Sequence, residues 1–164
     1  MAAPGIDRAD GARLFPFEQK WSVQMSGPEL ARPACAPYLC VSDSAAAIAC
    51  YLHVFGGREL YRQPADDGKR LMHADLELGN GGRIYLSDDF PEWTGGRTPD
   101  TIGGTPVTVH LQFAAGAAVD AVFTQAVEAG AVVELAPNDA FWGDRFAVFR
   151  DPFGHRWSLG GTIG

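Results

Sequence analysis

Two stretches of the chain, His73-Ala-Asp-Leu-Glu-Leu-Gly-Asn-Gly-Gly-Arg-Ile-Tyr-Leu-Ser87 and Arg145-Phe-Ala-Val-Phe-Arg-Asp-Pro-Phe-Gly-His-Arg-Trp-Ser-Leu159, share one skeleton. Each predicts a strand, a turn that contains glycine, and a second strand. Upstream, Gly56 and Gly130 are offset by nearly the same number of residues, so the repeat extends beyond these stretches. Two copies of one unit predict a fold built by pairing two similar halves, and a binding site is expected where the halves meet.

The order of the expected elements is the same in both halves. The first half predicts a strand at 38–41, a helix at 45–55 capped by Asp43 or Ser44, and strands near 58–63, 72–78 and 83–87. The second half predicts a strand at 107–113, a helix at 117–129, and strands near 131–135, 145–150 and 156–160. Residues 88–104, rich in Gly and Pro, are expected to form a joining loop. The sequence therefore predicts an α+β fold of two βαβββ modules.

The length of 164 residues suits one well-buried core and is too short for two ordinary domains. Residues 35–164 are expected to form a single domain, with modules at about 36–88 and 105–160. Residues 1–34 are expected to be an N-terminal extension, because no hydrophobic period is sustained there. Its aromatic segment Leu14–Trp21 is expected to cover a sheet surface or a partner.

Composition excludes several classes of function. The net charge of −7 and the pI near 4.9 argue against nucleic-acid binding, which needs clustered Lys and Arg. No apolar run approaches the ~18 residues that span a bilayer, and no secretory signal is visible. The three cysteines are odd in number and lack C-x-x-C spacing, which predicts reduced thiols and a cytoplasmic location.

Alternation along the expected strands separates polar from apolar side chains. In the strand near 72–78, His73, Asp75 and Glu77 share one face, and three apolar side chains share the other. A face open only to water would favour Lys, Glu and Thr, so each sheet is expected to bury one face under its helix and turn the other toward a common cup. The polar and aromatic side chains predicted to line this cup include Tyr38, Cys40, His73, Asp75, Glu77, Arg83, Tyr85, Thr108, His110 and Gln112.

Four of these side chains are candidates for acid–base chemistry. Histidine is a common general acid or base, which makes His73 and His110 candidates, and Asp75 and Glu77 can orient them. The alternative is that both histidines are hydrogen-bonded structural residues of the cup. A displaced metal centre built from His73, His110 and a carboxylate is a further alternative.

Other candidates serve binding. Arg145 or Arg83 can offer a guanidinium fork to an anionic group, and Trp142 can supply a flat apolar wall. The alternative for Arg145 is an internal turn lock with Asp144, with Trp142 packed on the core. Cys40 points toward the cup, where an inert thiol is expected rather than a nucleophile.

Motifs over about residues 36–160 resemble those of the vicinal oxygen chelate superfamily, which includes glyoxalase I, extradiol dioxygenases, fosfomycin-resistance enzymes and bleomycin-binding proteins. They are Tyr51 late in the first helix, Phe55-Gly-Gly57 after it, and Asp151-Pro-Phe-Gly-His-Arg-Trp-Ser-Leu159. Three further motifs resemble the PhnB-like branch of this superfamily: Met72-His-Ala-Asp-Leu76, Gly103-Gly-Thr-Pro-Val-Thr-Val-His110 and Phe141-Trp-Gly-Asp-Arg145. The resemblance implies a glyoxalase/bleomycin-resistance-type cupped sheet.

In metal-dependent members of this superfamily, His, Glu or Gln from four strands hold a divalent cation. The resemblance places those four slots at Ala36, Tyr85, Thr108 and Ser158. Ala lacks a donor, and neutral Ser, Thr and Tyr are poor ligands for such ions. No metal and no cofactor are therefore expected, and Tyr85, Thr108 and Ser158 are expected to contact the ligand instead.

Three functions remain open at this point, each with a small molecule as partner and a homodimer as the expected assembly. The first is metal-independent binding for sequestration or resistance. The second is a metal-free enzyme that performs an isomerase, lyase or cyclase type of proton transfer. The third is a metal-dependent lyase or dioxygenase with relocated ligands.

Overall fold

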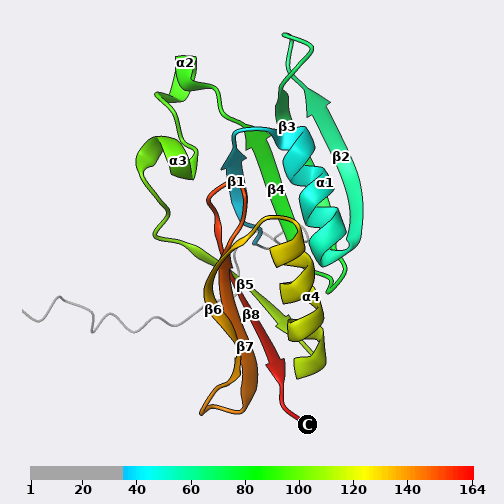
Figure 1. Ribbon diagram of the computed structural model, residues 1–164. Helices are drawn as coiled ribbons and strands as arrows, with labels where there is room; N and C mark the ends of the chain where they lie inside the picture. Colours follow the sequence, from blue (N-terminus) through cyan, green and yellow to red (C-terminus); the bar gives the residue numbers. More distant parts are fainter. Residues whose placement is uncertain (1–34) are drawn as a thin grey trace, which may run out of the picture. The chain divides into compact units, whose positions relative to one another are not determined.

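The computed structural model describes residues 35–164 (Figure 1). Residues 1–34 lie outside the described residues, and with them the expected contact of Leu14–Trp21.

Each half of the described chain forms one βαβββ module (Figure 1). The first module consists of β1 (Tyr38–Val41), α1 (Ser44–Phe55), β2 (Gly57–Pro64), β3 (Leu71–Leu78) and β4 (Arg83–Asp88). The second consists of β5 (Thr108–Phe113), α4 (Gly116–Glu128), β6 (Val132–Asp139), β7 (Asp144–Arg150) and β8 (Arg156–Thr162). The strands form two four-stranded sheets, in the orders β1-β4-β3-β2 and β5-β8-β7-β6, which we call the first and the second sheet. The predicted α+β fold of two βαβββ modules is confirmed.

The joining segment departs from the expected loop over 88–104, because it contains two short helices. They are α2 (Pro91–Thr94) and α3 (Pro99–Ile102). Each begins with proline, whose fixed φ suits the first helical position, and each ends at a glycine with positive φ. The Gly and Pro content that predicted a loop therefore marks the ends of two helical turns.

Helix α1 begins and ends where the sequence predicts. The Asp43 side chain accepts a hydrogen bond from the Ala46 amide at 2.9 Å, and Gly56 ends the helix with a φ of 68°. The buried side chains of α1 join the apolar faces of β3 and β4 in the core. The helix therefore covers the apolar face of the first sheet.

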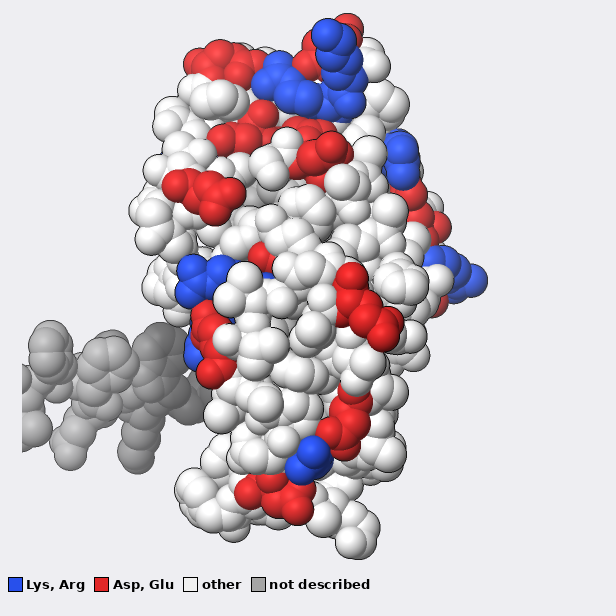
Figure 2. Space-filling view, viewed as in Figure 1, with Lys and Arg blue, Asp and Glu red and all other residues white. Residues whose placement is uncertain are grey.

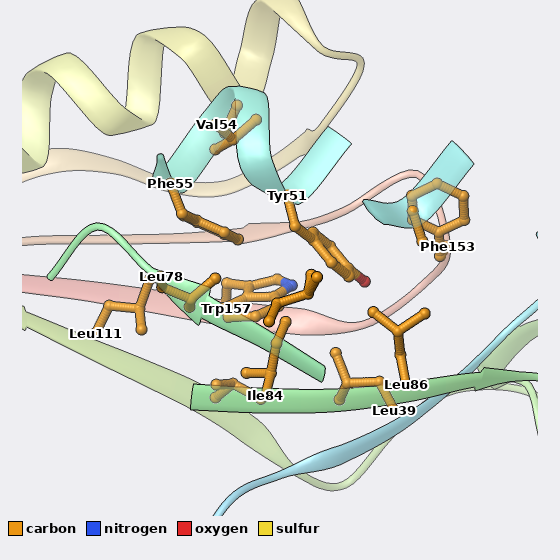
Figure 3. Close-up of a cluster of buried hydrophobic side chains, with 14 of the residues drawn as sticks. Leu39, Tyr51, Val54, Phe55, Leu78, Ile84, Leu86, Leu111, Phe153 and Trp157 are labelled. Atoms are coloured by element: carbon orange, nitrogen blue, oxygen red, sulfur yellow. The ribbon is translucent and has the colours of Figure 1, made fainter. Parts of the chain in front are cut away.

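One hydrophobic cluster contains side chains from both modules (Figure 3). Trp157 of β8 is completely buried, and its ring lies 4.6 Å from the Phe55 ring and 5.4 Å from the Tyr51 ring, between centroids. Phe153, from the turn between β7 and β8, contacts Tyr51 edge-on. Burial of such large aromatic surfaces makes the two modules share one core.

A buried carboxylate also joins the modules. Asp151 accepts hydrogen bonds from the Tyr51 hydroxyl at 2.7 Å and from the Trp157 indole N–H at 2.8 Å. It further accepts the backbone amides of Phe153 and His155, each at 2.9 Å. Burial is the largest cause that raises the pKa of Tyr51 well above its usual value, and the negative charge of Asp151 is the second. The Tyr51 hydroxyl therefore stays protonated and donates its hydrogen bond to Asp151.

On the face that carries α1 and α4, basic side chains lie beside acidic ones (Figure 2). Among the helices of the described residues, none is long and apolar enough to cross a membrane.

Candidate functional site

The polar faces of both sheets follow the predicted alternation. Leu39 and Val41 of β1 are buried, whereas Tyr38, on the opposite face of the strand, is 54% exposed. Val109 and Leu111 of β5 are buried, and His110 between them is exposed. The hydrogen bonds and aromatic contacts of the described residues place the predicted site residues in two groups, one on each sheet.

On the first sheet, His73 lies among three tyrosines. Between ring centroids it is 5.4 Å from Tyr38, 5.1 Å from Tyr85 and 6.1 Å from Tyr61. Strand register explains this grouping, because Tyr38 pairs with Tyr85, Tyr85 with Asp75, and Asp75 with Tyr61. We call Tyr38, Tyr61, His73 and Tyr85 the tyrosine–histidine cluster.

One hydrogen-bond chain orients the His73 ring. The Tyr38 hydroxyl donates to the Met72 carbonyl oxygen at 3.2 Å and lies 2.9 Å from His73 Nδ1. The Met72 carbonyl can only accept, so both contacts are hydrogen bonds only if Nδ1 carries a proton and donates to Tyr38 Oη; we assign this tautomer to His73. His73 Nε2 then presents a lone pair, and no described residue donates a hydrogen bond to it. Partial burial raises the pKa of Tyr38, which keeps this phenol protonated at neutral pH.

The two carboxylates predicted to act with His73 are engaged by arginines. Arg83 makes two hydrogen bonds to Asp75, one of them 2.6 Å long from Nε. Arg58 lies 3.1 Å from Glu77 across the β2–β3 pair. Asp75 and Glu77 therefore balance guanidinium charges on this face, and Arg83, expected to be available for an anionic ligand, already holds a carboxylate.

Cys40 is half-buried on the same face and is a poor nucleophile. Burial raises the pKa of its thiol to about 11, with further contributions from Asp89 and Asp88. At neutral pH almost none of the thiol is ionised, in agreement with the expected inert role.

On the second sheet, His110 is held by hydrogen bonds at both ring nitrogens. Nδ1 lies 2.9 Å from Ser158 Oγ, and Nε2 lies 3.0 Å from Gln112 Oε1. The parallel register pairs His110 with Ser158 and Gln112 with Gly160. A Cβ at position 160 would lie 2.6 Å from Gln112 Oε1, so the glycine there leaves space for the hydrogen-bonded side chains of His110 and Gln112. Neither nitrogen of His110 is left free for a ligand.

An aromatic strip continues from His110 to the tip of the β6–β7 hairpin. His110 stacks on Phe146 at 6.3 Å, and Trp142 meets Phe146 edge-on at 5.3 Å, between ring centroids. Trp142 is 53% exposed. Trp142 is therefore not packed in the core, which was the alternative to its predicted role as an apolar wall.

Arg145 and Thr108 bind other protein side chains. Arg145 bonds Asp120 at 2.8 Å and Asp139 at 3.1 Å, so its internal ion pairs involve these residues rather than the expected Asp144. It lines a hollow of about 460 Å³ beside the start of α4. Thr108 accepts a hydrogen bond from Arg156 at 2.8 Å. Arg145, like Arg83, already has carboxylate partners in place of a ligand anion.

The side chains at the four positions that the resemblance assigns to the superfamily's metal slots are poorly suited to a divalent cation. Tyr85 is part of the tyrosine–histidine cluster, Thr108 is bonded to Arg156, and Ser158 to His110, while Ala36 has no donor atom. Over residues 35–164, no three His, Cys, Asp or Glu side chains come together in a group able to hold a metal ion.

A groove of about 290 Å³ adjoins the tyrosine–histidine cluster at Tyr38. Its lining includes Leu39 from β1, Val107 just before β5 and Val109 of β5, together with the polar residues Thr105, His155 and Arg156. A planar molecule stacked on Tyr38 would therefore find apolar surface beside it.

Two residues of these groups were missed in the sequence. Tyr61 was missed because a register shift between Glu59 and Tyr61 breaks the alternation along β2. Phe146 was missed because an aromatic side chain in a strand is expected on the core face. A count of the aromatic residues in neighbouring strands could have identified both Tyr61 and Phe146 from the sequence.

Comparisons with known proteins agree with this architecture. The family model described as Glyoxalase/Bleomycin resistance protein/Dioxygenase superfamily matches residues 32–159. The uncharacterized protein Rv0887c of Mycobacterium tuberculosis is 45% identical over 157 residues, which cover 86% of this chain and 89% of that protein.

Solved structures show the same fold. The crystal structure of TioX from Micromonospora sp. ML1 is 30% identical with a TM-score of 0.58, covering 77% of this chain and 96% of that one. The PhnB protein of Bacillus cereus is 17% identical with a TM-score of 0.61, covering 79% and 98%, a likeness in fold alone. The resemblance drawn from the motifs is confirmed: the chain belongs to the glyoxalase/bleomycin resistance protein/dioxygenase superfamily.

Proposed function

We propose that this protein binds a small organic molecule at the tyrosine–histidine cluster, without a metal ion, and acts in sequestration or resistance. The observation that carries the proposal is the group of three tyrosines around His73 on a partly exposed sheet face. Aromatic rings supply most of the buried contact area in small-molecule sites, and few polar atoms fix orientation.

Two further observations favour the first sheet over the second. No residue of the described part of the chain bonds Nε2 of His73, whereas both ring nitrogens of His110 are engaged by Ser158 and Gln112. The groove beside Tyr38 adds a place for the body of the ligand. Residues of the second sheet, such as Gln112 and Trp142, stay in the proposal as a second wall that contacts the same ligand.

Tyr38→Ala and Tyr85→Ala are each expected to weaken ligand binding by about three- to tenfold, because each removes one aromatic contact. A thermal-shift screen of small organic molecules identifies ligands, and calorimetric titration then compares the variants. Trp93→Ala is the control, since Trp93 is 69% exposed on α2 and its ring stacks on Phe90 rather than on a ring of the cluster, so its loss should leave the affinity unchanged. A ligand whose affinity ignores both tyrosines would show that the site lies elsewhere.

Purified protein is expected to contain no stoichiometric metal, and chelators should change neither its melting temperature nor its ligand affinity. The reason is the poor donor set at Ala36, Tyr85, Thr108 and Ser158. Elemental analysis before and after dialysis against EDTA measures this. About one Zn, Fe, Mn or Ni per chain, lost on His73→Ala or His110→Ala, would favour a lyase or dioxygenase with relocated ligands instead.

A metal-free enzyme is the second candidate, and the oriented ring of His73 favours it. A histidine whose Nδ1–H is fixed by Tyr38 has its Nε2 lone pair ready to accept a proton in an isomerase, lyase or cyclase type of reaction. Product analysis of each ligand incubated with the protein separates the two candidates, because a binding protein returns its ligand unchanged.

A homodimer and a cytoplasmic location complete the proposal. Val132, Val133 and Leu135 on the edge strand β6 are exposed, and an exposed apolar edge suits association with a second copy. The cysteines at 35, 40 and 50 form no disulfide, which suits a reducing compartment.

A further inference from the structure

In the tautomer assigned to His73, the tyrosine–histidine cluster carries a ring nitrogen to which none of residues 35–164 donates a hydrogen bond. The Met72 carbonyl accepts the Tyr38 proton, Tyr38 Oη accepts the Nδ1–H of His73, and Nε2 is left with a lone pair. Ligand groups that donate a proton complement this nitrogen, whereas groups that only accept do not. Burial of Nε2 against a ligand that cannot donate would leave it unsatisfied.

The cluster is also nearly free of net charge. Arg83 is paired with Asp75, and Arg58 with Glu77. Arg97 is the one arginine of the described residues without an ion pair, and its guanidinium donates to the Thr94 carbonyl oxygen in the joining segment at 3.5 Å. The four charged groups of the two ion pairs thus neutralise one another, so a charged ligand would lose hydration without gaining an unpaired counter-charge among them.

The rings define the shape of the ligand. Tyr38 and Tyr85 lie 6.0 Å apart edge-on, and Tyr38 and Tyr61 each leave about half of their surface exposed. Exposed ring surface on a sheet face favours a flat aromatic body that can stack or meet a ring edge-on.

We infer that the cluster binds a neutral, planar aromatic molecule that carries an O–H or N–H donor, and that His73 Nε2 accepts this donor. The inference rests on the proposed function and names the chemical class of its ligand. It also makes His73 the residue that sets specificity, while the tyrosines supply contact area.

Four probes with one naphthalene body test the inference by calorimetric titration: 2-naphthol, 2-methoxynaphthalene, 2-naphthoate and 2-naphthylmethylammonium. We expect 2-naphthol to bind about three- to tenfold more tightly than 2-methoxynaphthalene, the usual effect of one hydrogen bond. Both charged probes should bind more weakly than 2-naphthol. His73→Phe should abolish the preference for 2-naphthol while 2-methoxynaphthalene still binds.

Two variants make the result specific. His53→Phe, the same substitution at an exposed position of α1, should keep the full preference. Tyr38→Phe removes the hydroxyl that fixes the Nδ1 proton and should reduce the preference, even if His73→Phe fails to fold.

Several outcomes would overturn the inference. If all four probes bind equally and Tyr85→Ala weakens all of them, the site is right and the ligand class is wrong. If His110→Phe, rather than His73→Phe, abolishes the preference, the acceptor lies on the second sheet. If no probe binds although the screen yields ligands, the class is wrong and the proposed function stands; an empty screen contradicts the proposed function itself.

Discussion

Asp151→Ala is expected to lower the free energy of unfolding by about 3–5 kcal/mol, because it leaves several buried donors without an acceptor. The Asp151 carboxylate is 6% exposed and accepts from Tyr51, Trp157 and two backbone amides. The measurement is urea unfolding followed by tryptophan fluorescence and circular dichroism.

Asp144→Ala is the matched control for this prediction. Asp144 begins β7, the strand that Asp151 follows, and its carboxylate makes no hydrogen bond to another described residue. Its loss should change stability by no more than about 0.5 kcal/mol. Equal effects of the two substitutions would show that Asp151 does not join the modules. A large difference would make the Asp151–Leu159 motif a structural element of the fold rather than part of a catalytic site.

Gly57→Ala is expected to cost about 3–5 kcal/mol, the second large effect. Gly57 has a φ of 103°, and a Cβ there would lie 2.0 Å from the Glu77 carbonyl oxygen and 2.8 Å from Leu78 Cα. Both atoms belong to the backbone of β3, which cannot move aside without breaking the β2–β3 pairing. Thermal and urea unfolding measure the loss.

Gly68→Ala separates the steric clash from the strain of a positive φ. Gly68 also has a positive φ, of 67°, but nothing lies within 4 Å of a Cβ built on it. It should cost about 1–2 kcal/mol. Should Gly57→Ala cost no more than Gly68→Ala, close approach to β3 is not what requires glycine after α1.

Local sequence was sufficient to predict most of the fold. Alternation placed Leu39 and Val41 in the core and His110 on the polar face, since the period of a strand depends only on the chain itself. The joining segment was less predictable, because proline is common both in turns and at helix starts, and Pro91 and Pro99 fit either. The residues after each proline decide between the two structures.

The candidate site could be predicted only as a set of side chains. That His73 and Tyr85 face the same way follows from alternation, but the tyrosines that surround His73 come from β1, β2 and β4, and strand order brings them together. The sequence likewise could not show which arginines remain available for a ligand, because the carboxylate partners of Arg83 and Arg145 lie on other helices and strands.

The sequence by itself determined two βαβββ modules, their faces and the lack of good metal donors at the superfamily's four slots. These properties depend on residue type and on the period along the chain, both of which are local. Only the tertiary structure decided that, among the described residues, both ring nitrogens of His110 have partners while Nε2 of His73 has none. The reason is that the Nδ1 partners, Tyr38 for His73 and Ser158 for His110, lie on other strands of the same sheet, and strand register is a property of the assembled sheet.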